Sequence, residues 1–174
     1  MKKLSCEVLV SPNVQYITEV EELLPTNIAN CLFNSILCYN IFIFNIVTIN
    51  AIRKASSLPK TLRTLLSSLA VSDVGVGMLV QPLFISLLVN VIQEENPSCN
   101  TYKAFDMMMG LFPTASFLGV VAVSVDRFLA IQFHLRYQEL VTHKRAVAVV
   151  ISIWLCSAGV SLMTLWATDR KSVV

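Results

Sequence analysis

Two sets of charged residues lie inside long apolar stretches of this chain. Asp126 and Arg127 are adjacent in "VAVSVDRFLAI", and Asp73 is the single charge in "LAVSDVGVG". A carboxylate in the middle of a membrane helix costs about 2.5–3.5 kcal/mol, and such residues usually face a bundle interior or a water-filled cavity. Their positions therefore predict a functional charge pair at Asp126 and an ion or proton site at Asp73.

Each of these interpretations has a structural alternative. An arginine at a membrane boundary commonly sets topology, but Asp126 does not fit that role, because a carboxylate near the C-terminal end of a helix opposes the helix dipole. Asp73 would alternatively bond to a neighbouring helix, a contact worth only about 0.6 kcal/mol on average. That is less than the insertion cost, so a hydrated site is favoured. Asn45 and Ser116 would reach Asp73 if their helices pack together.

The composition indicates that helices in a bilayer position these residues. The chain has 174 residues, of which 55% are hydrophobic and 14% are charged, whereas soluble domains carry about 25% charged residues. Four windows are apolar for the roughly 20 residues that a membrane helix needs. We predict an all-α membrane protein with an N-terminal segment over 1–22, helices over about 23–52, 62–92, 104–133 and 146–168, and a polar tail over 169–174.

The charges of the connecting loops predict the orientation of these helices. The first connection holds four basic residues and no acid, and the third is also basic overall, whereas the N-terminal segment and the second connection are mainly acidic. Basic loops stay in the cytoplasm. We therefore expect the N-terminal segment to be extracellular, with Asp126 and Arg127 at the inner end of the third helix.

Several function classes do not fit the residue pattern. The sequence shows no Ser/His/Asp, Cys/His or paired-carboxylate arrangement, so an enzyme is not expected. The net charge of +2 is too small to indicate a nucleic-acid partner. The five cysteines lack the spacing of a zinc site or a disulfide framework. A transporter or channel is disfavoured because Asp73 is the only ionisable group in mid-membrane and no repeat is visible.

Six residues, in the motifs "FNIVTINAI", "LAVSD" and "VDRFLAI" and beyond them, stand in an order and spacing typical of one receptor family. They are Asn45, Asp73, Pro82, Ser116, Arg127 and Trp154. Over about residues 26–168 the chain resembles the first four helices of a rhodopsin-like (class A) G-protein-coupled receptor. Its loop "HLRYQELVTHKRA" is most similar to that of adenosine and melanocortin receptors. The resemblance implies a seven-helix bundle of which this chain holds four helices.

The resemblance implies roles for the residues at the inner end of the bundle. Arg127 would face the G protein and be held inactive by Asp126. Phe128 stands in place of the family's tyrosine, which keeps the ring and loses the hydroxyl. Leu135 would insert into a groove of the G protein.

The same resemblance implies an allosteric sodium ion in mid-membrane. Asp73, Asn45 and Ser116 would supply carboxylate, amide and hydroxyl oxygens, which suit a hard cation. No other cofactor is expected. Pro82 and Trp154 would be structural residues.

The outer half of the third helix contains the candidate ligand pocket, Asp106, Met109 and Gly110. Met109 stands where amine receptors carry an aspartate. Asp106 lies one turn earlier and is the alternative, although an acid at a helix entrance is more often solvated. Cys99 lies three residues before the position of the family's disulfide cysteine, and its partner is not identified.

The sequence stops after the fourth helix, so we expect a truncated receptor that does not signal alone. In complete form it would couple an extracellular small-molecule or peptide ligand to a heterotrimeric G protein at the plasma membrane, within the lipid bilayer and with receptor dimers as further partners. The alternative is a non-signalling membrane fragment that associates with full-length receptors and retains them in the endoplasmic reticulum.

Overall fold

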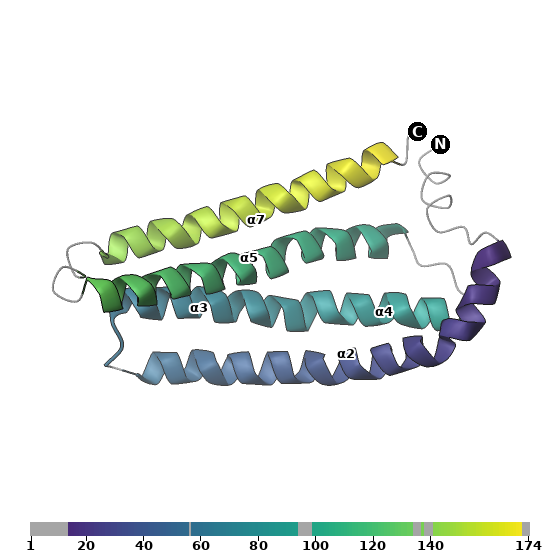
Figure 1. The fold of residues 1–174 in the computed structure, drawn as a ribbon, viewed down its shortest axis with the longest axis horizontal. Coiled ribbons are helices and arrows are strands. Elements are labelled where there is room, and N and C mark those ends of the chain that lie inside the picture. The colour runs from purple at the N-terminus through teal and green to yellow at the C-terminus, as the bar shows by residue number, and fades with distance from the viewer. Residues whose placement is uncertain (1–13, 56, 94–98, 134–136, 138–140, 172–174) are drawn as a thin grey trace.

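The computed structural model describes residues 14–55, 57–93, 99–133, 137 and 141–171. Over these residues the chain is helical apart from short turns, and it forms no β-strand. Four long helical segments lie side by side and run alternately in opposite directions (Figure 1). Each is long and apolar enough to cross a membrane. The predicted all-α membrane fold is confirmed.

One π-helical turn, which is one residue wider than an α-helical turn, divides the second of these segments into three elements. The element bounds are α2 (Val14–Lys54), α3 (Lys60–Gly75), η1 (Val76–Val80), α4 (Gln81–Ile92), α5 (Cys99–Gln132) and α7 (His143–Lys171). α2 and α5 begin before positions 23 and 104, where the apolar windows led us to expect their starts, because such a window marks only the part that crosses the hydrocarbon. The N-terminal part of α2, which contains Pro25, turns away from the rest (Figure 1), since proline interrupts the helical hydrogen bonds.

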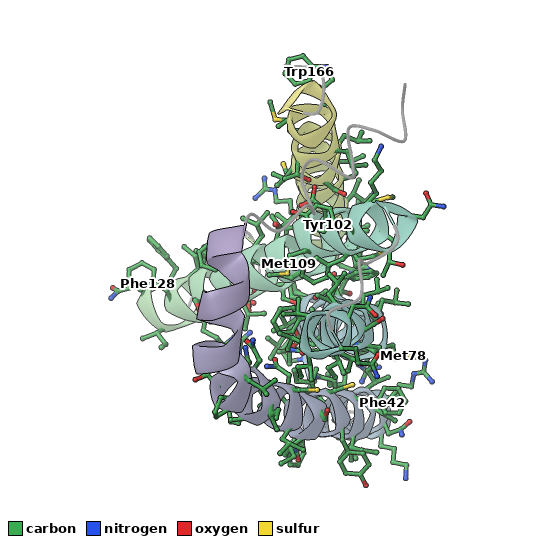
Figure 2. All side chains as sticks on the ribbon, turned by 90° about the vertical axis from the view of Figure 1, so that its right-hand side faces the viewer. Phe42, Met78, Tyr102, Met109, Phe128 and Trp166 are labelled. Carbon is green, nitrogen blue, oxygen red and sulfur yellow. The ribbon has the colours of Figure 1, made fainter. Side chains whose placement is uncertain are left out.

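α5 lies inside the array and carries most of the candidate residues. From one edge to the other, the order is α2, then α3 with η1 and α4, then α5, then α7 (Figures 1 and 2). α5 packs against α3 on one side and α7 on the other, while α2 packs against α3, η1 and α4. Asp126 and Ser116 therefore lie on a helix that has neighbours on two sides.

Small residues allow these helices to approach closely. A Cβ atom at Gly110 of α5 would lie 2.8 Å from the Cα atom of Ser161 on α7. A Cβ atom at Gly119 would lie 3.2 Å from the side chain of Leu69 on α3. Ser157 and Ser161 are both buried. Interfaces of small residues are typical of membrane helices, because packing rather than the hydrophobic effect drives their association.

Large apolar side chains cover the outside of the array. On the two edge helices they include Leu32, Phe33, Ile36, Tyr39, Phe44, Ile151, Leu155, Leu162, Met163 and Trp166. Exposing such side chains to water would be costly, whereas lipid tails are as apolar as the side chains themselves. The surface therefore suits a bilayer.

Candidate functional site

Asp126 and Arg127 form an ion pair near the end of α5. Arg127 Nε donates a hydrogen bond to Asp126 Oδ2 at 3.0 Å, and Arg127 Nη2 bonds to the same oxygen. Asp126 is only 4% exposed, whereas the side chain of Arg127 is 42% exposed. The buried carboxylate is therefore paired, as a buried charge must be, while the guanidinium reaches the edge of the bundle.

Tyr137, in the connection between α5 and α7, completes this site. Its hydroxyl donates to Asp126 Oδ1 at 2.7 Å, so both carboxylate oxygens are hydrogen bonded. Burial, the hydrogen bond to Asp126 and the negative charge of that carboxylate raise the pKa of Tyr137 to about 12, with the charge of Arg127 acting in the opposite direction. The phenol therefore remains a donor at neutral pH.

Tyr137 is absent from the residues predicted from the sequence. It lies eleven residues after Asp126 in a polar loop, and hydropathy carries no information about where such a loop folds back. The only signal was an aromatic hydroxyl within "HLRYQELVTHKRA", beside a helix end that holds a carboxylate.

Of the two other residues predicted for the inner end, the structure describes Phe128 and not Leu135. Phe128 is 59% exposed and points away from the helices (Figure 2). Its ring therefore lies on the outer surface of α5, away from the side where Asp126 is buried. Leu135 lies outside the described residues, so its contact with a partner stays a prediction.

The mid-membrane carboxylate bonds to the neighbouring helix. Ser116 Oγ of α5 donates to Asp73 Oδ1 of α3 at 2.5 Å and lies 3.0 Å from Ser72 Oγ. Ser72 is buried, and its hydroxyl oxygen lies 2.7 Å from the carbonyl oxygen of Leu69. Since each hydroxyl has one proton to donate, Asp73 is the terminal acceptor of a short hydrogen-bonded group. The structure thus brings Asp73 and Ser116 together.

Asn45 does not join this group. Its side-chain amide donates to the carbonyl oxygen of Ile41, one turn earlier in α2, at 2.8 Å. Within the described part of the chain, no hydrogen bond links Asn45 to Asp73. An amide on a membrane helix is readily satisfied by its own backbone, which the spacing of residues along the sequence does not reveal. The hydroxyl that contacts Asp73 comes instead from Ser116, which also lies beside Ser72.

The residues predicted for a ligand pocket divide into two groups in the outer half of α5. Asp106 is half-buried and Met109 is 48% exposed. Gly110 faces α7 instead, where the backbone of Ser161 is too close to admit a Cβ atom. The structure therefore gives Gly110 a packing role rather than a place in an open pocket. α5 begins at Cys99, whose side chain is not among those described, so its disulfide stays a prediction.

Trp154 of α7 joins α3 and α5. Its Nε1 donates to Ser68 Oγ at 3.1 Å, and its ring meets that of Phe112 edge-on, with the centroids 6.2 Å apart and the planes at 88°. Gly75 makes room for Phe112, since a Cβ atom there would lie 2.2 Å from that ring. Pro82 is the second residue of α4 and lies just after the turn of η1, where it has no N–H to donate to the preceding turn.

Comparisons with known proteins agree with this arrangement. Residues 44–174 match the sequence family described as 7 transmembrane receptor (rhodopsin family). The chain is 34% identical to the adenosine receptor A2b of Gallus gallus over 126 residues, 32% identical to that of Canis lupus familiaris over 127 residues, and 31% identical to that of Bos taurus over 128 residues. These alignments cover 72–73% of this chain and 36–37% of each relative. The chain thus spans just over a third of the length of these relatives.

The family match covers most of the chain and every helix from the inner half of α2 to the end of α7. It includes the ion pair of Asp126 with Arg127 and the contact between Asp73 and Ser116. The four apolar helices have the length and composition that such a receptor needs. The chain belongs to the rhodopsin family of seven-transmembrane receptors.

Proposed function

We propose that these four helices form part of a G-protein-coupled receptor bundle, which transmits the binding of an extracellular ligand to a G protein on the cytoplasmic side. The observation that carries the proposal is the ion pair of Asp126 and Arg127, in which the carboxylate is buried and the cation is 42% exposed. Opening such a pair would release Arg127 towards a partner while Asp126 stayed in the bundle. A charge pair that biases two arrangements is a known form of switch.

α5 connects the two ends of the proposed pathway. It is one continuous helix of 34 residues, about 50 Å long at 1.5 Å per residue. Met109 lies in its outer half, and Asp126 lies near its inner end. A ligand that binds one of two arrangements of this helix more tightly would shift the population towards that arrangement. The same displacement would then change the environment of Asp126.

The ligand is proposed to be an extracellular small molecule or peptide. Adenosine is the first candidate to test, because the three relatives are adenosine receptors. Met109 and Asp106 are the side chains of the outer half of α5 proposed to line its site. Since such a ligand arrives from outside the cell, we propose the plasma membrane as the location.

A sodium ion beside Asp73 is proposed as a regulator of the same bundle. The hydroxyl of Ser116 lies within hydrogen-bonding distance of both the carboxylate of Asp73 and the hydroxyl of Ser72, and oxygen ligands of this kind suit a hard cation. Among the described residues, no basic side chain pairs with Asp73. A bound cation would supply the positive charge that the mid-membrane carboxylate otherwise lacks.

Coupling is tested in a chimera in which these helices are completed by the remaining helices of the Gallus gallus relative. Adenosine should raise G-protein activation by this chimera, and Arg127→Ala should abolish the response while leaving surface expression in place. Arg53→Ala is the matched control, because Arg53 is also basic but lies in the last turn of α2. An Arg127→Ala chimera that signals as well as the unmutated one would remove Arg127 from the mechanism.

A second candidate function is association with full-length receptors, which would retain them inside the cell. The observation that favours it is the large apolar surface on the edge helices α2 and α7, including Phe33 and Leu155, which another helix could cover as well as lipid. Co-expression of this chain should then lower the surface level of a full-length relative. An unchanged surface level at equal expression would dismiss this function.

A further inference from the structure

The carbonyl group of Gly77 has no donor within its own helix. The backbone N–H of Gln81 bonds to the carbonyl of Val76, five residues earlier, so the turn at Val76–Val80 is one residue wider than an α-helical turn. The next residue that could donate to Gly77 in this wider pattern is Pro82, which has no N–H. Neither the α-helical donor nor the wide-turn donor is therefore available to Gly77.

A thiol from the neighbouring helix supplies the missing donor. Cys38 Sγ of α2 donates to the carbonyl oxygen of Gly77 at 3.0 Å. The two backbones are close here, because a Cβ atom at Gly77 would lie 3.2 Å from both Ile41 Cγ2 and the backbone nitrogen of Phe42. In hydrocarbon, a carbonyl without a donor is costly. The bond from Cys38 therefore satisfies a group that water cannot reach.

The wide turn removes the helical donor from the carbonyl of Gly77. In a regular α-helix, Pro82 would leave the carbonyl of Met78, four residues earlier, without a donor. The side chain of Met78 is 56% exposed and points away from the other helices (Figure 2). In the wide turn Gln81 donates to Val76 instead of Gly77, so the carbonyl of Gly77, which is buried and within reach of Cys38, loses its donor as well. The thiol thus favours the wide turn over the regular helix.

Whether this turn is wide or regular determines how the residues after it are rotated about the helix axis. One extra residue in a turn rotates the later residues by about 100° about the helix axis. Phe84 of α4 follows the turn and stacks on Phe105 of α5, with ring centroids 5.9 Å apart and planes at 27°. Rotation of α4 by that angle would separate the two rings.

We propose that Cys38 is a positioning residue that sets the rotation of the outer half of the second membrane helix. Through its hydrogen bond to Gly77, it holds the wide turn and so keeps Phe84 against Phe105. This inference does not depend on coupling to a G protein. It makes Cys38, in the first helix, a determinant of the contact between the second and third helices.

The bond is tested by a double-mutant cycle in the 174-residue chain reconstituted in lipid nanodiscs. Cys38→Ala should lower the melting temperature by roughly 2–4 °C, whereas Cys156→Ala, which removes an exposed free thiol, should change it little. In a Pro82→Ala background the N–H of residue 82 is restored, so Cys38→Ala should cost much less. An equal loss in both backgrounds would show that Cys38 acts by packing alone, which overturns the proposal.

The rotation is tested by photo-crosslinking. With p-benzoylphenylalanine in place of Phe84, the unmutated chain should crosslink to the segment of α5 around Phe105. Cys38→Ala and Gly77→Ala should each lower that yield severalfold. Gly159→Ala is the control, because a Cβ atom there meets nothing within 4 Å. A crosslink of unchanged yield and position in Cys38→Ala would refute the role of Cys38 in rotation, even if that variant were less stable.

Discussion

Two carboxylates of the membrane helices, those of Asp126 and Asp73, have different surroundings. Asp126 is 4% exposed and bonds to a guanidinium through one oxygen and a phenol through the other. Asp73 bonds to the hydroxyl of Ser116 and, within the described residues, to no cation. The carboxylate of Asp126 therefore has a cationic partner within the chain, whereas that of Asp73 has none among the described residues. In the function proposed above, the site at Asp126 would switch by breaking its ion pair, and the site at Asp73 by gaining or losing a sodium ion.

Removal of the carboxylate of Asp126 should change the free energy of unfolding more than substitution of Asp73 or Tyr137. Asp126→Ala leaves both Arg127 and Tyr137 without their partner, and breaking a buried ion pair costs about 3–5 kcal/mol. Because Arg127 is half-exposed, we expect a smaller loss, about 2–3 kcal/mol in the free energy of unfolding in mixed micelles. Asp126→Asn, which keeps an acceptor for Tyr137, should lose less. If both variants lose the same amount, the charge of Asp126 accounts for the whole stabilisation, and an uncharged acceptor for Tyr137 adds nothing.

Removal of the charge of Asp73 should instead raise the free energy of unfolding. Asp73→Asn keeps an acceptor for Ser116 and removes an unpaired charge, so in sodium-free buffer it should raise the free energy of unfolding by about 1–2 kcal/mol. Added sodium should stabilise the unmutated chain and have no effect on Asp73→Asn. Potassium at the same ionic strength is the control for screening. A sodium effect that survives in Asp73→Asn would place the ion elsewhere.

Removal of the phenol hydroxyl should have the smallest effect and would sharpen the description of the inner site. Tyr137→Phe deletes one hydrogen bond to Asp126, which is worth about 1 kcal/mol.

The pKa of Tyr137 adds a pH dependence to this prediction. Because the pKa rises from 10.0 to about 12 in the folded chain, the stabilisation should be fully present below pH 10 and be lost as the pH rises through 12. The difference in phenolate absorbance between the unmutated chain and Tyr137→Phe measures this titration directly. A phenol that ionises at the ordinary tyrosine pKa would mean that its bond to Asp126 is not formed.

Some of the site could be predicted because it depends on residues that are near in sequence or on whole helices. Asp126 and Arg127 are adjacent, so their pairing requires only one helix. The contact of Asp73 with Ser116 requires only that two mid-membrane positions lie at the same depth. Tyr137 could not be found in this way, because it reaches Asp126 from a loop. Asn45 was expected at Asp73 and bonds to Ile41 instead, since proximity in depth does not determine which acceptor an amide meets.

The sequence by itself determined that this chain forms four apolar helices with a few charges that need partners. The reason is that hydropathy is a sum over neighbouring residues and does not depend on packing. Only the tertiary structure decided which atoms satisfy those charges and carbonyls, because a hydrogen bond is made or lost within a few tenths of an ångström. The bond of Cys38 to Gly77 and the contact of Gly110 with Ser161 both depend on how closely two helices approach, and that approach is a property of the packed bundle.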